Sequence, residues 1–517
     1  MDSILFDFLA RHRGWFIFLF AVPISFIWTC TQHLRNFIFR TFFSTNKYHN
    51  SLVEQIQKQV REAYKNKQQM CTARKPWKTM SLRVATYKAN CVQIPVNLKN
   101  ILSLDVSNKT IRVEPMVTMS DITHYLVPKG YALAVHPEMD DLTIGGLCMG
   151  VGIETTSHRH GFLFETIEAF EVVIADGSLI RATRTQNADL FHALPWSHGT
   201  LGFMVAVELK IVSIKPYMRL HYIPCYSQEE FCTQFQSLSE AEKPPAYLEA
   251  LVYSPSKSMI LCGELADLDE LEFGVTINPI NRWYKPWFHT HIESFFTKKG
   301  SHVEFIPLRH YFHRHTPSVF FQLKDLIPFA NSAWYRYLFS WLGAPKVSLI
   351  KLTYTKSLRK QSLFNRVTQD VIVPLSDLSE VLTFSHEHFS IYPLWICPVR
   401  LFNHANYEGF LRNSSRMFVD VGIYGIPKAV IEKEPWDMVS VSRNLETLTR
   451  KKAGYHLLYA DIFMTREEFE EMFNHQHYQA MRKKYHAEHV FPDVYEKVLP
   501  ESWLLNLKEY QERARAQ

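Results

Sequence analysis

The sequence predicts an α+β protein of about three domains, with an apolar helix near its amino terminus. Three observations lead to this prediction. An uncharged, mostly apolar run covers residues 14–34, and a glycine-rich segment followed by a hairpin-like pair of apolar runs lies within residues 136–212. Segments of helical and of strand periodicity are mixed along the rest of the 517-residue chain. With 47% apolar residues, the chain can bury a sizeable core.

Composition and charge argue against several classes of protein. A formal charge of +6 is small for this length, and without a dense block of Lys or Arg it argues against a nucleic-acid partner. The eight cysteines form no Cys-x-x-Cys pair, which argues against a zinc ribbon or a dithiol redox site. A large body with few, unpatterned cysteines is typical of a reducing, cytosol-facing location.

The apolar run at residues 14–34 is long enough to just cross a hydrocarbon core of about 30 Å at ~1.5 Å per residue. Pro23 is expected to kink this helix. Basic residues stand on both sides, so the positive-inside rule does not fix its orientation. A cleaved signal peptide is the alternative, but no small-x-small cleavage site follows the run. We therefore expect an uncleaved single-pass anchor at residues 1–42, with the body of the protein on the cytosolic side.

The body begins with an amphipathic helix, which the helical spacing of apolar residues from Val53 to Tyr64 predicts. Strand-like runs follow at residues 81–84, 93–98 and 110–115. A short helix is expected over residues 119–126, with Ser120 or Asp121 as its cap.

Residues 171–175 and 178–182 are apolar runs that flank Asp176-Gly177. An Asp-Gly pair between such runs favours a tight hairpin, because both central residues can take positive φ. A long strand is expected next, over residues 203–212.

Beyond Pro216 the pattern loosens until about Lys452. Residues 283–288 and 334–339 mix aromatic with basic side chains, which is typical either of a lip at a membrane interface or of a buried aromatic core. The sequence from Thr465 to Glu468 is a capping box, which predicts a helix with its apolar residues at 469, 472 and 473 facing inward.

Glycines 145, 146, 150 and 152 lie within one short loop. Such density lets backbone N–H groups approach a pyrophosphate without obstruction by a Cβ atom. A Rossmann site needs a third glycine, but Gly150-Val151-Gly152 is followed by Ile153-Glu154-Thr155. Spacing alone therefore leaves two interpretations, a phosphate-binding loop or a tight bend between strands.

A longer array of residues is more specific than this loop. It comprises Gly145-Gly146, Gly150-x-Gly152, Ser157, Gly161, Glu165, Ala175-Asp176-Gly177, Asp189-Leu190-Phe191 and Gly199-x-x-Gly202-Phe203. With this array the segment resembles the FAD domain of the vanillyl-alcohol-oxidase/p-cresol-methylhydroxylase (PCMH) type. Together with residues 308–315 and 458–461, nearly the entire chain resembles the delta-24 sterol reductase group of that family.

The resemblance implies a two-subdomain PCMH-type FAD-binding domain at 43–215, an α/β substrate-binding cap at 216–455, and C-terminal helices at 456–517 that pack back on the FAD domain. It also implies that one loop wraps the FAD diphosphate. The implied cofactor-binding residues are Gly145, Gly146, Gly150, Val151, Gly152, Ile153, Glu154, Thr155, Thr156, Ser157, His158, Arg159, His160, Gly161, Phe162, Leu163 and Gly202.

The loop at residues 71–77 departs from this family pattern. Many relatives are glycine-rich there, whereas this chain has no glycine and offers the charge of Arg74 instead. The loop also lacks histidine, so we expect FAD to be bound without a covalent link.

The resemblance further implies that NADPH is the reductant and that the enzyme reduces the delta-24 side-chain double bond of a sterol intermediate, of the desmosterol-to-cholesterol type, at the endoplasmic reticulum membrane. An isolated alkene is not polarised, so hydride delivery has to be coupled to protonation of the other alkene carbon. No separate nicotinamide motif is visible, so we expect NADPH and sterol to use one face in turn.

Five residues are candidates for the proton donor: His310, His313, His315, Tyr459 and Glu154. Imidazoles can titrate near neutrality, a tyrosine can act through a relay, and the glutamate falls within the implied flavin loop. The alternatives are a structural role for the histidines in an aromatic layer and a backbone-capping role for the glutamate. Because the histidine cluster contains no acidic residue, no metal site is expected. Capping or solvated-turn roles are expected for Glu138, Asp140 and Asp141.

Two other functions remain open at the level of sequence. A flavin oxidase of an alcohol or lactone would consume oxygen without NADPH. A catalytically degenerate flavin fold would serve as a sterol-binding scaffold, and the altered loop at residues 71–77 is the only support for it.

Overall fold

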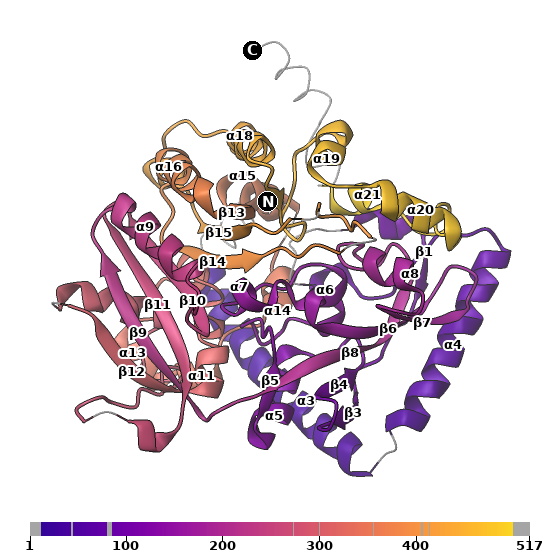
Figure 1. The fold of residues 1–517 in the computed structure, drawn as a ribbon, viewed down its shortest axis with the longest axis horizontal. Coiled ribbons are helices and arrows are strands. Elements are labelled where there is room, and N and C mark those ends of the chain that lie inside the picture. The colour runs from indigo at the N-terminus through magenta and orange to yellow at the C-terminus, as the bar shows by residue number, and fades with distance from the viewer. Residues whose placement is uncertain are drawn as a thin grey trace.

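The computed structural model describes residues 12–42, 45–79, 85–271, 273–298, 300–354, 356–404, 407–412 and 414–499. They form a six-stranded and an eight-stranded sheet, both antiparallel, together with a two-stranded parallel pair and many helices (Figure 1). The α+β prediction is confirmed. The predicted strand at residues 81–84 and residues 1–11 of the predicted anchor lie outside the described residues.

The six-stranded sheet is built from the segment that contains the predicted hairpin. Its strands are β3 (Ile101–Asp105), β4 (Thr110–Val113), β5 (Tyr131–Leu133), β6 (Ile167–Val173), β7 (Leu179–Thr183) and β8 (Phe203–Ser213), in the order β3-β4-β8-β6-β7 with β5 also on β8. The predicted long strand is therefore confirmed as the centre of this sheet. Between β6 and β7 the loop is wider than predicted, and only Gly177 takes a positive φ, of 84°.

The eight-stranded sheet has the order β12-β9-β11-β10-β14-β15-β13-β16. Its strands are β9 (Tyr217–Cys225), β10 (Tyr247–Ser254), β11 (Lys257–Ala266), β12 (His302–Pro307), β13 (Val367–Pro374), β14 (Leu394–Arg400), β15 (Met417–Gly425) and β16 (Tyr455–His456). One face packs under α9 (Gln228–Ser239), α16 (Leu378–His388) and α18 (Met438–Lys451) (Figure 1). The opposite face is turned toward the first sheet.

Side chains alternate between the two faces of the second sheet, as strand geometry requires. On β15, Val419, Val421 and Ile423 join the helix-covered core. Phe418 and Tyr424 lie on the other face and join the larger core shared with the first sheet. Polar residues at alternate positions of these strands are therefore buried between the two sheets.

The two-stranded sheet consists of β1 (Met70–Thr72) and β2 (Val92–Ile94), which pair in parallel. The strand predicted at residues 93–98 is therefore shorter than expected, since only its first two residues belong to β2. The remaining helices are α5 (Met119–Leu126), α6 (Ile144–Met149), α7 (Ser157–His160), α8 (Ala188–Ala193), α10 (Phe288–Glu293), α11 (Leu308–Phe312), α12 (Leu323–Leu326), α13 (Ala333–Leu338), α14 (Val347–Leu352), α15 (Lys356–Asn365), α17 (Lys428–Glu432), α19 (Arg466–Met472), α20 (Gln476–Lys484) and α21 (Val494–Val498).

Two helix caps test the predictions from sequence. The capping box at α19 is confirmed, because Thr465 accepts from the Glu468 backbone N–H and Glu468 returns the contact. At α5 the predicted cap was wrong by two or three residues. Thr118 is the cap, and Asp121 is its capping-box partner.

The amino-terminal helix consists of α2 (Arg13–Phe16), a π-helical turn η1 (Ile17–Ala21) and α3 (Val22–Phe42), and α4 (Thr45–Lys65) follows. The π turn lies directly before Pro23, where the missing backbone N–H interrupts ordinary α-helical bonding. The stretch Arg13–Phe39 contains an 18-residue window with a mean hydropathy of 1.7 and is long and apolar enough, by length and composition, to cross a membrane. α4 buries Val53, Ile56 and Val60, so the predicted amphipathic helix is confirmed.

Candidate active site

A cavity of about 1180 Å³ lies between the glycine-rich segment and the inner face of the second sheet. A single small ligand typically occupies a pocket of ~300–1,000 Å³, so this cavity has room for a large cofactor and a second ligand together. Residues of α3 form part of its wall as well.

The glycine-rich segment presents bare backbone to the cavity. Gly145, Gly146, Gly150 and Gly152 all belong to the lining. At Gly150 an added Cβ would lie 2.6 Å from the carbonyl oxygen of Gly146, and at Gly152 it would lie 2.9 Å from the Cβ of Leu163. Glycine is therefore required at these two positions for close backbone packing. The N–H groups of Gly145 and Gly150 donate to the Pro115 and Gly146 carbonyls, and the absence of Cβ atoms leaves the backbone of the segment open to a ligand.

Basic side chains also line the cavity: Arg74, Lys75, Lys78, Lys88, Lys99, Lys346, Lys351 and Lys497. Arg74 donates to the Thr143 hydroxyl at 3.0 Å and to the Lys78 carbonyl at 2.8 Å. Its buried Nε has no hydrogen-bond partner among the described residues. An orphaned guanidinium donor beside bare backbone suits an anionic group, so these residues fit the diphosphate of FAD.

The inner face of the second sheet carries two fully buried carboxyls, Asp370 on β13 and Asp420 on β15. Tyr424 donates a hydrogen bond to Asp370, and Tyr459 is a further hydrogen-bond partner of the same carboxyl. Both tyrosines line the cavity. Asp370 pairs across the strands with Gly422, where an added Cβ would lie 2.6 Å from the Tyr424 hydroxyl, so this glycine makes room for the ring.

Burial sets the protonation of this cluster. Burial raises the pKa of Asp370 to about 7, although hydrogen bonds from Tyr424 and Tyr459 oppose the rise. Burial and then the neighbouring Asp370 raise the pKa of Asp420 well above its usual range. Burial, Asp370 and Asp420 likewise raise the pKa of Tyr459. The cavity wall therefore holds a protonated tyrosine in contact with a carboxyl that titrates near neutrality.

Glu154 lies outside the cavity lining, in a buried ion-pair group. Its Oε1 accepts from the Arg314 guanidinium at 2.8 Å and from the Thr155 backbone N–H at 2.9 Å. Arg314 also makes two hydrogen bonds of 2.7 Å to Glu249 on β10. The side chains of Arg314 and Glu249 are 0% exposed, and that of Glu154 is 3% exposed. This group joins the glycine-rich segment to the second sheet.

Glu138 lines the cavity and is only 5% exposed, so the expected solvated-turn role is wrong for this residue. Burial and then the adjacent Glu154 carboxylate raise the pKa of Glu138 well above its usual range. Glu138 is therefore a second neutral acid at the cavity.

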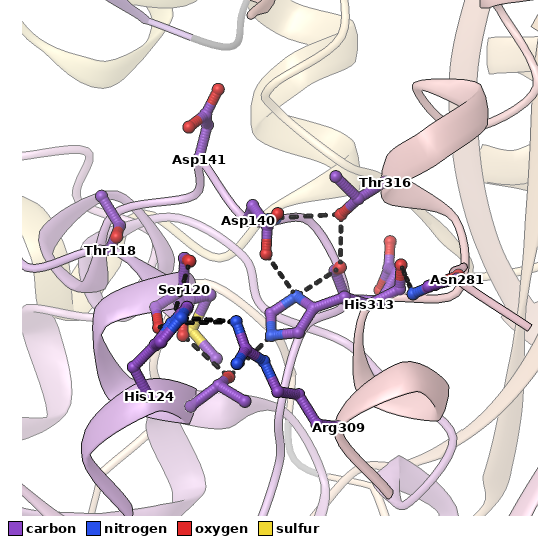
Figure 2. Close-up of polar contacts among 12 residues, drawn as sticks. Thr118, Ser120, His124, Asp140, Asp141, Asn281, Arg309, His313 and Thr316 are labelled. Atoms are coloured by element: carbon purple, nitrogen blue, oxygen red, sulfur yellow. Dashed lines mark hydrogen bonds and ion pairs between the residues drawn. The ribbon is translucent and has the colours of Figure 1, made fainter. Parts of the chain in front are cut away.

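Figure 2 shows His313 in a polar cluster that includes Asp140 and Thr316, two residues of the cavity lining. Its Nδ1 lies 2.8 Å from Asp140 and its Nε2 lies 2.7 Å from the Thr123 hydroxyl. Asp140 belongs to the cavity lining, and His313 stands behind it. Burial alone would raise the pKa of Asp140, but His313, Lys346 and Arg309 together outweigh burial, and the pKa is lowered.

The other two predicted histidines are also set back from the cavity. The His310 ring accepts from the Asn281 backbone N–H at 3.3 Å, and burial followed by the charge of Arg282 lowers its pKa. His315 is fully buried among aromatic rings, with Phe320 at 4.9 Å between ring centroids, and burial lowers its pKa. Of the five predicted proton donors, the structure places Tyr459 at the cavity.

The predicted cofactor residues fall into two groups. Arg74, Gly145, Gly146, Gly150, Val151, Gly152, Ile153 and Gly202 line the cavity. Glu154, Thr155, Thr156, Ser157, His158, Arg159, His160, Gly161, Phe162 and Leu163 lie behind the lining. The Thr155 carbonyl accepts from Leu248 of β10 at 2.9 Å, and the His158 ring contacts the Pro245 carbonyl at 2.8 Å, so this part of the loop docks on the second sheet.

Sequence reasoning missed Asp370, Asp420 and Tyr424. A local signal was present, since Asp420 interrupts an otherwise apolar run at residues 417–425 and Asp370 lies within a run rich in β-branched residues at 367–374. A carboxyl at an inward position of a strand buried on both faces is costly, which often marks a functional group.

Comparison with known proteins agrees with this site. The cavity-lining backbone with glycines 145, 146, 150 and 152 is called the glycine wall below. A family model described as an FAD binding domain matches residues 51–183, which include β1 to β7 and the glycine wall. The fold and the site thus define an FAD-dependent flavoprotein, as the glycine array predicts.

Full-length relatives narrow this class. The delta(24)-sterol reductase of Homo sapiens is 40% identical over 495 residues, covering 95% of this chain and 94% of the relative. A delta(24)-sterol reductase homologue of Caenorhabditis elegans is 38% identical, covering 95% of each chain. The delta(24)-sterol reductase of Arabidopsis thaliana is 36% identical, covering 95% of this chain and 92% of the relative. The chain belongs to the delta(24)-sterol reductase family, and the resemblance drawn from its motifs is confirmed.

Proposed function

We propose that this chain is an FAD-dependent enzyme that uses NADPH to reduce the delta-24 side-chain double bond of a sterol. One arrangement carries the proposal. A single cavity reaches from the glycine wall to Tyr459, in a chain whose relatives over 95% of its length are delta(24)-sterol reductases. The family supports a reductase over a flavin oxidase or a scaffold.

Each wall of the cavity has a distinct task in this proposal. Arg74 and the backbone of residues 145–152 hold the cofactor. When bound, FAD supplies the hydride that one alkene carbon receives. The proton for the other carbon comes from the opposite wall, where the Tyr459 hydroxyl faces the substrate.

Asp370 makes this proton transfer feasible. A tyrosine with a raised pKa gives up its proton only if it receives another at the same time. As the O–H bond of Tyr459 breaks toward the substrate carbon, a proton moves from Asp370 to the phenolic oxygen. Tyr424 donates to Oδ1 of Asp370 and holds this carboxyl in place, and Asp420 is a neutral neighbour behind it.

The domain boundaries and location follow from the same proposal. We assign an FAD-binding domain to residues 43–215, a substrate-binding cap to 216–455 and a C-terminal segment to 456–517, of which the described part, through Leu499, packs back on the FAD-binding domain. Hydrogen bonds from Tyr478 and Arg482 to Thr200 support the last assignment. The apolar helix supports membrane association, and we assign the protein to the endoplasmic reticulum membrane with its body in the cytosol.

The decisive experiment is anaerobic. NADPH is added to purified protein that carries FAD, and a delta-24 sterol such as desmosterol follows. Loss of the flavin absorbance with NADPH and its return with the sterol, together with formation of the saturated product, is the expected result. Bound flavin that responds to neither reagent would reject the reductase and favour the flavin oxidase. Failure to bind FAD on reconstitution would favour the scaffold.

Tyr459→Phe tests the proton donor within this cycle. Loss of absorbance with NADPH should keep its rate, whereas the return with sterol should slow on the order of 10²-fold, because only the second half needs the proton. Glu138→Gln is the comparison variant, since Glu138 is the other neutral acid at the cavity. If Glu138→Gln slows the sterol step and Tyr459→Phe does not, Glu138 is the donor.

A further inference from the structure

The amino-terminal helix is packed against the body of the protein. Ile17 and Val22 are 0% exposed, and Ala21 is 5% exposed. With Phe18 they share a core with Leu323, Ile327 and Tyr335 of the segment around α12 and α13. Within the stretch Arg13–Phe39, one face of the helix thus meets protein instead of lipid.

Polar contacts and close packing fix this helix along its length. At Gly14 an added Cβ would lie 2.6 Å from the backbone carbonyl of Leu326, so the helix touches the main chain there. Arg13 donates to Thr353 at 3.1 Å, Ser25 accepts from the Lys346 backbone N–H at 2.9 Å, and Asn36 donates to Asp121 of α5 at 2.5 Å. Figure 1 shows α3 running beside α5.

The other face of the helix is apolar and exposed, and it continues onto α13. The term apolar face is used below for six side chains that are 47–61% exposed: Trp15, Leu19, Ile27, Trp334, Tyr337 and Leu338. Ring contacts connect its two parts, because Phe329 lies 4.8 Å from Trp15 and 5.6 Å from Trp334 between ring centroids. An apolar surface of this kind, contributed by two separate segments, marks an interaction site.

We propose that the protein is monotopic: the apolar face enters one leaflet of a phospholipid bilayer, and the helix Arg13–Phe39 lies along the interface. Two observations favour a leaflet over a spanning arrangement. Spanning would strip the helix from Leu323, Ile327 and Tyr335 and expose that core. In addition, Trp and Tyr side chains with basic neighbours are typical of membrane interfaces, and here Arg336 lies between Tyr335 and Tyr337.

The position of the cavity assigns a role to the apolar face in substrate entry, and this role rests on the proposed function. Three aromatic residues line the cavity and are also 36–54% exposed: Phe26, Trp28 and Trp341. The ring centroids of Phe26 and Trp341 lie 5.6 Å apart, beside the apolar face. The cavity therefore reaches the surface next to the bound leaflet. A sterol can pass from the leaflet to Tyr459 without crossing water.

The membrane topology of the full-length chain, without any substitution, tests the proposal. Epitope tags are placed at both termini, and sealed microsomes are treated with protease, with detergent-opened microsomes as the digestion control. A monotopic protein has both termini on one side, so both tags are lost or both are protected. One tag lost and the other protected would show a spanning helix and overturn the proposal. Neither outcome depends on sterol reduction.

A charge-insertion variant tests the apolar face itself. Tyr337→Glu with Leu338→Glu places two charges on α13, where both side chains are 60% exposed. Flotation with phosphatidylcholine–phosphatidylserine vesicles should fall several-fold, because the carboxylates would have to enter the leaflet. Leu179→Glu with Ile431→Glu is the matched control, at residues that are 45% and 67% exposed away from this face, and should float normally.

Unchanged flotation of the α13 variant, with normal FAD content and thermal unfolding, would overturn the proposal. A fall in its molecular mass in detergent, from dimer to monomer with flotation unchanged, would assign the apolar face to a second copy of the chain and would overturn it equally.

Discussion

Asp370 has the chemical properties of a proton reservoir. It is fully buried, burial raises its pKa to about 7, and two tyrosines that line the cavity contact it. A group that titrates near the working pH can both give and regain a proton, which makes it suited to acid catalysis. Its function therefore depends on its surroundings as much as on its residue type.

Asp370→Asn should slow the sterol-dependent return of flavin absorbance on the order of 10²-fold and leave FAD content unchanged, because the amide cannot resupply the proton. Stopped-flow absorbance measures this rate. Glu446→Gln is the matched control, since burial raises the pKa of Glu446 to about 8 but the residue lies outside the cavity lining. Equal slowing in both variants would refute a specific relay.

The same residue predicts a pH dependence of stability. Because the folded protein raises the pKa of Asp370 from 3.8 to about 7, its contribution to the free energy of unfolding is complete below about pH 4 and is lost as the pH rises through about 7. Asp370→Asn should flatten this fall. Urea unfolding of both proteins at pH 5 and pH 8 checks the expectation, and parallel pH curves would contradict it.

At the scale of single elements, α6 and its following turn form the glycine wall. The four glycines do not serve one purpose. Gly152 is needed for packing against Leu163, whereas at Gly146 an added Cβ would meet no protein atom closer than 3.4 Å. Gly146 also lines the cavity, so the absence of a Cβ atom there allows a ligand to approach the backbone closely.

Gly146→Ala should therefore leave thermal unfolding of the FAD-free protein unchanged and weaken FAD binding by about tenfold or more, because the methyl group stands between backbone and ligand. Flavin fluorescence titration measures the affinity. Gly152→Ala is the comparison, and it should lower the unfolding temperature of the FAD-free protein because its Cβ would lie 2.9 Å from Leu163. An unaltered FAD affinity for Gly146→Ala would argue against close approach at this position.

The amino-terminal helix is the second element whose packing can be tested. Gly14→Val should destabilise the protein by about 1–3 kcal/mol, because its side chain would strike the Leu326 carbonyl. Leu19→Val is the control, since Leu19 is 56% exposed and its shortening should have little effect. Thermal unfolding in mild detergent measures both. Equal stabilities would indicate a helix that is independent of the body.

At the scale of the whole molecule, Arg314 joins the glycine-rich segment to the second sheet. Its guanidinium lies between Glu154 of the glycine-rich segment and Glu249 of the second sheet, and the group is almost fully buried. A buried cation that serves two carboxylates stabilises their relative position only while all three are present. The shape of the cavity between the sheets therefore depends on this contact.

Arg314→Met should destabilise the protein by about 3–5 kcal/mol, because two buried carboxylates lose their cation. Arg181→Met is the matched control, since Arg181 pairs with Glu208 but is 44% exposed, and it should lose at most about 1 kcal/mol. Denaturant unfolding at neutral pH measures the difference. Similar losses in both variants would contradict the assigned role.

The same group predicts a loss of stability in acid. Burial by itself would raise the pKa of Glu249, but the charges of Arg314 and His315 outweigh burial and lower it to about 2, from an ordinary 4.5. Its contribution to the free energy of unfolding is therefore present above about pH 4.5 and is lost as the pH falls through about 2. Arg314→Met should lack this loss, which unfolding between pH 5 and pH 2.5 can follow.

Local sequence determined the parts of the fold that depend on neighbouring residues. The helix around Val53–Val60, the strand Phe203–Ser213 and the capping box at Thr465 were all predictable, because periodicity and capping act over a few residues. The flavin class was predicted by the resemblance of the longer residue array to the PCMH-type FAD domain, since glycine spacing alone left a phosphate-binding loop or a tight bend. The cap at Thr118 was missed by two or three residues, since several side chains there can serve as caps.

Only the tertiary structure decided how distant segments meet. Asp370, Asp420 and Tyr459 come from β13, β15 and the loop after β16, and strand register brings them together. Periodicity gives the face on which a side chain lies but not the strand opposite, so this cluster could not be read from sequence. The arrangement of the apolar helix was likewise decided only by the tertiary structure. Its composition predicted a membrane segment, and only its packing on Leu323, Ile327 and Tyr335 distinguishes a helix that lies on the body from one that leaves it.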